Sequence, residues 1–164
     1  MKGDDAQEFT AFVWETGTRL QRAALLLTGD HHLAEDLTQA TYAKVFASWR
    51  RVRAADNQLA YARTVLLNTY LSHRRLRRSS ERPTDLAQDD RGVAAPDSAT
   101  RLDLLAALAT LDPLDRAVVV LRYWDDRSVA EVAADLSLTE TTVRSRARRA
   151  LQRLRPLVSE RTPS

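Results

Sequence analysis

Hydrophobic side chains recur at every third or fourth position along most of the chain, which is the spacing of an α-helix that buries one face. This pattern predicts helices over residues 6–28, 31–50, 58–78, 99–110 and 113–123. Gly29 and Asp30 separate the first two helices, because glycine stops a helix and aspartate favours the start of the next. Four glycines and five prolines in 164 residues favour long helices over a series of hairpins. The predicted fold class is therefore all-α.

Residues 128–155 are the most informative stretch, since their pattern indicates two helices joined by a tight turn. Ser128 and Glu131 have the spacing of a capping box, in which each side chain bonds the backbone N–H of the other residue. Thr139 is placed to cap the second helix. Ser137 occupies the turn position where glycine often supplies a left-handed backbone, which makes the geometry of this turn less secure.

The second helix of this stretch has an apolar stripe and an arginine-rich outer face. The stripe repeats at intervals of four, four and three residues: Val143, Ala147, Leu151 and Leu154. The residues off the stripe are Arg144, Ser145, Arg148 and Arg149. A helix of this kind fits the major groove of DNA, where arginine pairs with guanine through two parallel hydrogen bonds. The pattern favours a DNA-binding helix-turn-helix, and a helical hairpin with a solvated basic face stays open as the alternative.

The helix predicted over residues 31–50 has an outward face that carries acidic groups next to an aromatic ring. Its predicted buried stripe is Ala34, Leu37, Thr41, Val45 and Trp49. Its opposite face carries Glu35, Asp36, Gln39, Ala43 and Phe46. Carboxylates beside an exposed aromatic side chain form a surface of the kind that a protein partner uses. The alternative, equally open from spacing, is that Phe46 packs on the first helix and the carboxylates are only solvated.

A second basic region begins after this helix. Residues 51–57 are predicted to form a loop. The helix predicted over residues 58–78 has an inward-facing stripe formed by Leu59, Ala62, Leu66 and Tyr70. Its opposite side and flanks carry Arg63, Asn68, Ser72, Arg74 and Arg75. Hydrogen-bonding side chains among arginines are typical of a face that binds nucleic acid.

Residues 79–98 differ in composition from the helices around them, with Pro83 and Pro96 among many polar groups. Such a segment is typical of a linker. It divides the chain into an N-terminal unit over residues 1–78 and a C-terminal unit over residues 99–164. Each unit is small, so either one is expected to be only marginally stable alone.

The formal net charge of +3 conceals a strong alternation along the chain. The net charge is −4 over residues 1–43, +8 over 44–82, −6 over 83–138 and +5 over 139–164. The two basic blocks contain the two candidate DNA-binding helices. Of the 25 basic residues, 23 are arginine, which suits bidentate contacts to phosphate and guanine.

The sequence does not predict an enzyme, a metal site or a membrane protein. The chain has no cysteine, and His31 and His32 lack a third ligand at metal spacing. Neither a nucleophile–base constellation nor a phosphate-binding loop is found. No apolar run approaches the roughly 18 residues that cross a bilayer, and the first residues do not resemble a signal peptide. We therefore expect no cofactor, no metal and a cytoplasmic location.

Four segments, taken in order, resemble the extracytoplasmic-function group (group four) of the sigma-70 family of RNA polymerase sigma factors, in particular its actinobacterial SigE-like subgroup. The segments are Leu-Leu-Leu-Thr-Gly-Asp at 25–30, Ala-Glu-Asp-Leu-Thr-Gln-Ala-Thr at 34–41, the stretch 60–72 and the stretch from 111 through 146. Together they span nearly the whole chain in the order and spacing of the family. The chain departs from the family at Ser72, where some members have asparagine, and at Ser137, where glycine is common.

The resemblance implies two helical domains, sigma-2 over residues 1–78 and sigma-4 over residues 99–164, joined by a flexible linker. It implies a protein without catalytic chemistry of its own, which binds RNA polymerase core and directs transcription initiation at promoters. The implied partners are the clamp helices of the largest polymerase subunit, the flap of the second-largest subunit, promoter DNA as duplex and as non-template single strand, and an anti-sigma protein.

The resemblance also assigns residues to these roles. The polymerase-binding surface would be Glu35, Asp36, Gln39 and Phe46. The minus-10 element, with a base flipped from the non-template strand, would be read by Arg63, Asn68, Ser72, Arg74 and Arg75. The minus-35 element would be read by Arg122, Thr142, Arg144, Ser145, Arg148 and Arg149. The alternative is a helix-turn-helix regulator that binds DNA without joining polymerase core, and it would not need the polymerase-binding surface.

Replacing Arg149 with alanine should weaken promoter binding by about 1–3 kcal/mol if its guanidinium reads a base. If the side chain contacts only phosphate, the loss should be similar on every sequence and should depend on salt. Affinities measured on a matched and a scrambled promoter separate the two cases. An unchanged affinity for both DNAs would show that Arg149 is not a DNA contact.

Overall fold

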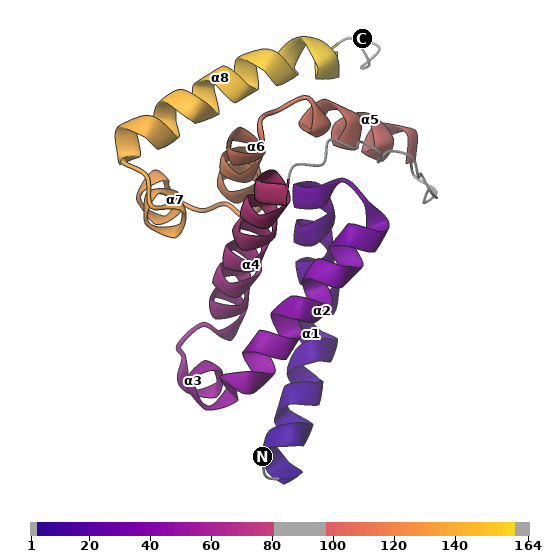
Figure 1. The fold of residues 1–164 in the computed structure, drawn as a ribbon, viewed down its shortest axis with the longest axis vertical. Helices are drawn as coiled ribbons and strands as arrows, with labels where there is room; N and C mark the ends of the chain where they lie inside the picture. The colour runs from indigo at the N-terminus through magenta and orange to yellow at the C-terminus, as the bar shows by residue number, and fades with distance from the viewer. Residues whose placement is uncertain (1–2, 81–97, 160–164) are drawn as a thin grey trace. The chain divides into compact units, whose positions relative to one another are not determined.

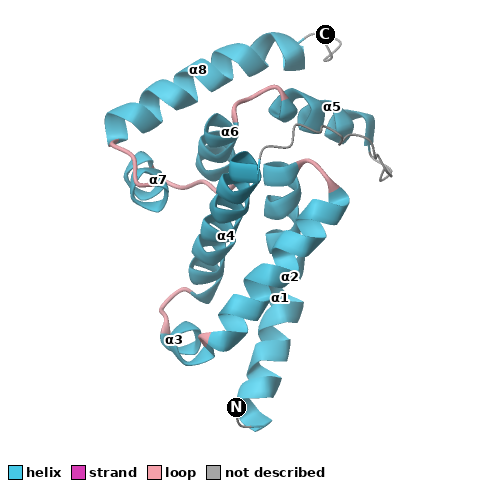
Figure 2. Ribbon diagram, viewed as in Figure 1, coloured by secondary structure: helices cyan, strands magenta, loops and turns pink. Residues whose placement is uncertain are grey.

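The computed structural model describes the backbone of residues 3–80 and 98–159, and the side chains of residues 3–73 and 103–157. Every regular element within these ranges is a helix, and none is a strand (Figure 1, Figure 2). The predicted all-α class is confirmed. Within the same ranges, none of the helices combines the length and hydropathy that crossing a membrane requires.

The chain divides into two compact units. Unit 1 consists of Met1–Leu25 and Asp30–Asp89, and unit 2 consists of Leu26–Gly29 and Asp90–Ser164. The predicted linker, residues 79–98, lies outside the described residues except at its two ends, which are helical.

The described part of unit 1 is built from four helices. They are α1 (Gly3–Thr28), whose residues from Leu26 onward belong to unit 2, α2 (His31–Ala47), α3 (Trp49–Ala54) and α4 (Gln58–Ser80). Asp30 begins α2, because its carboxylate accepts a hydrogen bond from the Leu33 N–H at 3.0 Å. Asn57 begins α4 in the same way, accepting from the Ala60 N–H at 2.9 Å.

Aromatic rings form the centre of unit 1. Phe12 and Trp49 are buried with their ring centroids 5.5 Å apart, and Phe9 and Tyr42 pack on them edge to face. Burying each such side chain contributes about 1.5–3 kcal/mol, so these rings hold α1, α2 and α3 together. The stripe predicted for residues 31–50 is buried throughout, with four residues on α2 and the last on α3: Ala34, Leu37, Thr41, Val45 and Trp49.

The prediction of a loop over residues 51–57 is wrong. Most of this segment belongs to α3, which follows α2 directly after Ser48. The two buried side chains of α3, Trp49 and Val52, are three positions apart, so a single helical turn places both against the core. Only residues 55–57 remain as a loop before α4.

The described part of unit 2 contains four α-helices and a π-helical turn. They are α5 (Ser98–Ala109), α6 (Pro113–Val119), the π-helical turn η2 (Val120–Trp124), α7 (Val129–Leu136) and α8 (Glu140–Ser159). Helix α8 packs on both α6 and α7. Val118, Val132 and Val143, one from each of these three helices, are completely buried.

The caps predicted at Ser128 and Thr139 are confirmed, and Asp112 caps α6 by accepting from the Leu114 N–H. In the capping box of α7, the Ser128 N–H donates to Glu131 Oε1 at 2.9 Å and the Glu131 N–H donates to Ser128 Oγ at 3.0 Å. At the start of α8, the Thr142 N–H donates to Thr139 Oγ1 at 3.1 Å. These bonds satisfy backbone N–H groups that a helix start otherwise leaves unpaired.

The π-helical turn η2 was not predicted from the sequence. It is closed by the Asp125 N–H, which donates to the Val120 carbonyl at 3.0 Å. The turn leaves Tyr123 and Trp124 about half exposed, just before the segment that leads to α7. Turns of this kind are rare and often occur at functional sites.

The turn between α7 and α8 has a left-handed backbone at Ser137, with φ 58° and ψ 46°. The serine therefore adopts the conformation that glycine supplies in other helix-turn-helix turns, with a steric penalty from its Cβ.

Replacing Ser137 with glycine should stabilise the protein by about 0.5 kcal/mol. The left-handed backbone costs a non-glycine residue about 1 kcal/mol, and the greater freedom of glycine in the unfolded chain offsets part of the gain. Ser137→Ala is the control, since alanine keeps the Cβ and should give no stabilisation. Urea denaturation followed by circular dichroism measures both, and a glycine variant no more stable than the alanine variant would contradict the expectation.

Candidate functional site

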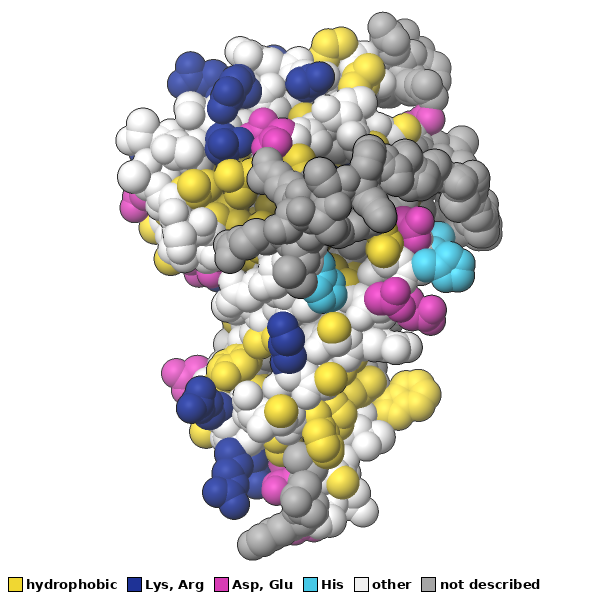
Figure 3. Space-filling model, in the orientation of Figure 1, with side chains coloured by type: hydrophobic (Ala, Val, Ile, Leu, Met, Phe, Trp, Pro, Cys, Tyr) yellow, Lys and Arg dark blue, Asp and Glu magenta, His cyan; other side chains and the backbone are white. Residues whose placement is uncertain are grey.

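Helix α8 presents the arginine-rich outer face that the sequence predicts. Its buried side consists of Val143, Ala147, Ala150 and Leu154. Its exposed candidates are Arg144, Ser145, Arg148 and Arg149. Figure 3 shows dark-blue Lys and Arg side chains over this helix. Because the packing of α8 uses only the opposite side, this face is open to a ligand.

The candidates on α8 differ in their intramolecular contacts. Arg144 Nη2 lies 3.3 Å from Glu140 Oε1, and both side chains are more than half exposed, so the pair stabilises the helix only slightly. Thr142 is half-buried and is engaged in the cap of the helix. Arg148 and Arg149 have no ion-pair partner within the described residues and are the candidates with the fewest competing contacts.

Arg146, which has no role in the predicted DNA-binding face, anchors α8 on α6. Its guanidinium Nη1 lies 2.6 Å from Asp115 Oδ1 and 3.4 Å from Asp112 Oδ2, at the start of α6. The pairs join residues 31 and 34 positions apart, so no local pattern reveals them. They fix the angle at which α8 presents its outer face.

Arg122, a candidate DNA contact, is half-buried and makes two contacts of its own. Its Nη1 donates to the Arg127 carbonyl at 2.7 Å, and its guanidinium lies 5.3 Å from the centroid of the Tyr123 ring. Arg127 in turn pairs with Asp135 of α7, with Nε 2.8 Å from Oδ2. These contacts hold the segment between η2 and α7, so Arg122 has a structural role whether or not it reaches DNA.

Glu131, in the capping box of α7, has a changed acidity. Its pKa lies below the ordinary value of 4.5, chiefly because the carboxylate accepts the Ser128 N–H and also because Arg127 is nearby. The charged form of Glu131 is thus favoured in the folded protein.

The outward face of α2 is exposed as predicted. The exposed candidates are Glu35, Asp36, Gln39 and Phe46. Phe46 is 42% exposed and also packs edge to face on Phe9 of α1, with ring centroids 4.9 Å apart. Both interpretations of Phe46 therefore hold in part, because the ring is anchored on α1 and still offers surface to a partner. A pocket of about 560 Å³ opens beside it, lined by Asp5, Phe46 and residues 47–51.

The candidates on α4 are only partly described. Asn68 and Ser72 are exposed and four positions apart, so they share one face of the helix. Arg63 is half-buried. Arg74 and Arg75 lie on the helical backbone of α4, but their side chains are outside the described residues. Tyr70 is buried in the core, as its place in the inner stripe predicts.

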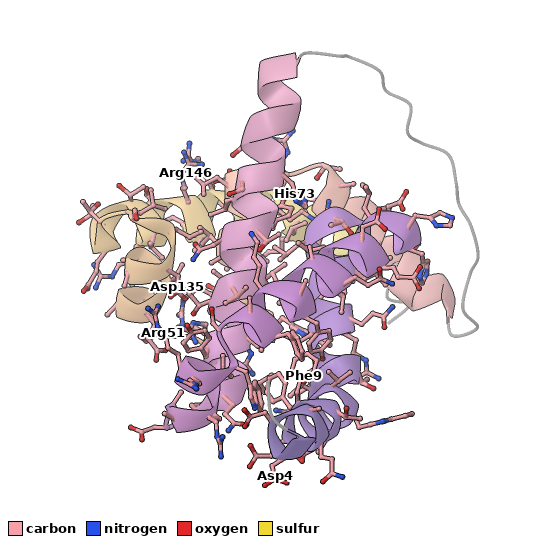
Figure 4. The ribbon with its side chains drawn as sticks, turned by 60° about the horizontal axis from the view of Figure 1, so that its bottom comes forward. Asp4, Phe9, Arg51, His73, Asp135 and Arg146 are labelled. Carbon is pink, nitrogen blue, oxygen red and sulfur yellow. The ribbon has the colours of Figure 1, made fainter. Side chains whose placement is uncertain are left out.

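Arg53 ties α3 to the first turns of α1, another pairing that the sequence does not reveal. Its Nη1 lies 2.6 Å from Asp5 Oδ1, and its Nη2 lies 3.3 Å from Glu8 Oε1. Arg50 and Arg51 of the same helix are exposed (Figure 4). The pairs hold α3, and with it the loop at residues 55–57, against the N-terminal helix.

The described residues contain no group of three or more histidine, aspartate or glutamate side chains that could hold a metal ion. His31 and His32 are both exposed at the start of α2. The surfaces that the structure does offer are of a binding kind: a basic helix face, a polar helix face and an acidic face with an aromatic ring.

Comparison with protein families places two conserved regions in the chain. The family model described as Sigma-70 region 2 matches residues 13–89, and the model described as Sigma-70, region 4 matches residues 101–154. The first match includes α2, α3 and α4, and the second includes α7 and most of α8.

Known proteins agree with this assignment along nearly the whole chain. The RNA polymerase sigma-E factor of Streptomyces coelicolor is 36% identical over 149 residues, which covers 90% of this chain and 84% of that protein. The ECF RNA polymerase sigma factor SigE of Mycolicibacterium smegmatis is 34% identical over 169 residues, which covers 96% of this chain and 65% of that protein. The sigma factor RpoE, in its co-crystal structure with the anti-sigma factor NepR from Bartonella quintana, matches with a TM-score of 0.78 and 25% identity, over 95% of this chain and 99% of that one.

Replacing Glu131 with alanine should lower stability at neutral pH by an amount that vanishes in acid. A carboxylate whose pKa is lowered in the folded state stabilises the protein above its unfolded pKa, near 4.5, and loses that effect as the pH falls through the lowered folded value. Thermal unfolding of wild type and Glu131→Ala from pH 7 to pH 3 measures the difference. A gap that stays constant over this range would mean that the charge of Glu131 does not contribute.

Proposed function

Since the chain belongs to the sigma-70 family of RNA polymerase sigma factors, in its extracytoplasmic-function group, we propose that its two units divide promoter-specific initiation between them. The chain is a sigma factor: it binds RNA polymerase core and directs transcription initiation by reading the minus-35 and minus-10 elements. In the proposed division, the N-terminal unit docks on the polymerase and opens the minus-10 element, and the C-terminal unit reads the minus-35 element.

One observation carries this proposal, namely that region 2 and region 4 follow each other in one chain and each presents a suitable outer face. The match to region 2 contains the acidic face of α2 and the polar face of α4, and the match to region 4 contains the arginine-rich face of α8. A regulator that only binds DNA would need the last of these faces and neither of the others.

The outer face of α8 is proposed to enter the major groove at the minus-35 element. Arg148 and Arg149 are exposed without an ion-pair partner in the described part of the chain, which leaves their guanidinium groups free to pair with guanine. Arg144 and Ser145 extend the same face, and Thr142 at the N-terminal end of the helix is placed near the backbone or a base edge. Arg122 is proposed to support this contact from the segment before α7.

The face of α4 is proposed to read the minus-10 element on the non-template strand. Asn68 and Ser72 offer hydrogen-bonding groups to a base that has left the duplex, and Arg63, Arg74 and Arg75 are assigned to phosphates or base edges. Unstacking a base costs a few kcal/mol, so these contacts must offset that amount. DNA melting is thereby coupled to recognition and needs no ATP.

The acidic face of α2 is proposed to dock on the clamp helices of the largest polymerase subunit. Glu35 and Asp36 supply charge that selects a basic partner and speeds association. Gln39 and Phe46 supply a hydrogen-bonding group and an anchored ring at the centre of the contact. The C-terminal unit is assigned to the flap of the second-largest subunit.

The remaining assignments extend the same proposal. Residues 1–78 are assigned to the sigma-2 domain, residues 79–98 to the linker and residues 99–164 to the sigma-4 domain. The region 4 match at 101–154 lies within the last of these, and the region 2 match at 13–89 extends from the first into the proposed linker. The chain has no catalytic role of its own, because the polymerase core makes the RNA, and it acts in the cytoplasm with that enzyme. Since the related RpoE was crystallised with an anti-sigma factor, we assign an anti-sigma protein as the regulator of this chain.

Replacing Asp36 or Gln39 with alanine should weaken the affinity for polymerase core by about tenfold, because the first removes a charge and the second a hydrogen-bonding group from the proposed contact. Glu15→Ala is the matched control, since Glu15 is an exposed carboxylate on α1, outside this face. Fluorescence anisotropy of the labelled chain titrated with sigma-free core measures all three. Wild-type affinity in both variants would refute the docking residues, and a wild-type chain that does not bind core would refute the function itself.

A further inference from the structure

Trp14 of α1 has the most exposed large hydrophobic side chain among the described residues. It is 83% exposed, compared with 50% for Tyr123, 48% for Trp124 and 42% for Phe46. A tryptophan this exposed keeps most of its large apolar surface in water, which is unfavourable unless a partner covers it. Tryptophan is also among the residues that contribute most to binding energy at protein interfaces.

The surface of α1 around Trp14 carries no charge. The residues three, four or seven positions away are its neighbours on the helix surface, and all are uncharged: Gln7, Thr10, Ala11, Gly17, Thr18 and Gln21. The charged residues among those described in α1 lie at least about 80° around the helix axis from Trp14. They are Asp4, Asp5, Glu8, Glu15, Arg19 and Arg22. A face that is merely solvated usually carries charges, whereas the centre of a protein interface is depleted of them.

This uncharged face of α1 is continuous with the outward face of α2. Gly17, one turn from Trp14, approaches Tyr42 of α2, since a Cβ at Gly17 would lie 4.0 Å from the Tyr42 hydroxyl. Thr16 and Tyr42 also share a hydrogen bond of 2.7 Å between their hydroxyl groups. Tyr42 is three positions from Gln39 and four from Phe46, so it adjoins both on the surface of α2. The face around Trp14 therefore adjoins the docking residues of α2 through Gly17 and Tyr42.

We infer that Trp14 and the uncharged face of α1 extend the polymerase-docking surface, so that α1 and α2 bind the clamp helices together. The inference rests on the proposed docking through α2. The complete surface has an apolar anchor on α1, an anchored ring at Phe46 and carboxylates at Glu35 and Asp36. This surface is complementary to a pair of helices that carry an apolar patch opposite Trp14 and basic groups opposite the carboxylates of α2. An apolar centre surrounded by a polar rim is the usual pattern of a protein interface.

The test compares Trp14→Ala with wild type in binding to sigma-free polymerase core. Trp14→Ala should weaken the affinity by at least about tenfold, and Trp14→Phe should recover part of the loss. Glu15→Ala is the matched control, because it removes an exposed side chain from the charged side of the same helix. The thermal unfolding of Trp14→Ala should match that of wild type, because the replaced side chain is almost fully solvated in the free protein.

The variant Asp36→Ala tests docking through α2 independently of the extension onto α1. If Asp36→Ala loses affinity and Trp14→Ala does not, docking through α2 stands and the extension onto α1 is refuted. If wild type does not bind core at all, both are refuted. A Trp14→Ala variant that binds core normally but loses self-association in sedimentation would also overturn the inference, by assigning the face to a second copy of the chain.

Discussion

Edge-to-face packing of Phe9, Phe12, Tyr42 and Trp49 is the interaction on which the arrangement of unit 1 depends. These rings occupy one side of α1 and of α2 and draw α3 onto the same core. The opposite sides of the helices are left to solvent, and there the docking and DNA-binding candidates lie. Loss of this packing would therefore affect the outer faces of α1, α2 and α3 together, although none of these four rings is itself assigned to a contact with polymerase or DNA.

In unit 2, polar contacts fix the positions of the helices. Arg146 pairs with two aspartates at the start of α6, Arg127 pairs with Asp135, and the caps at Ser128 and Thr139 fix where α7 and α8 begin. Some arginines of this unit thus set the position of α8, and others on its outer face are left for DNA. Replacing an arginine that positions α8 should lower stability. Replacing an arginine on the outer face should leave stability unchanged and make DNA binding less dependent on salt.

The features that could be predicted from the sequence are those that local spacing determines. The stripe of α2, the caps of α6, α7 and α8, and the exposed face of α8 all follow from residues within a few positions of one another. Helix α3 was missed because its two apolar residues lie in an arginine-rich stretch and give a signal of only one turn. The pairs formed by Arg53 and Arg146 were missed because their partners are tens of residues away, and spacing could not show that Phe46 is both packed and exposed.

The central claim, that this chain is a sigma factor whose two units read a promoter together, is tested most directly by run-off transcription. The purified chain would be added to sigma-free polymerase core with a promoter library as template. A sigma factor should produce defined new start sites, each preceded by shared minus-35 and minus-10 sequences at a fixed separation. The absence of start sites, from a chain that still binds duplex DNA and ignores core, would contradict the claim and favour a DNA-binding regulator.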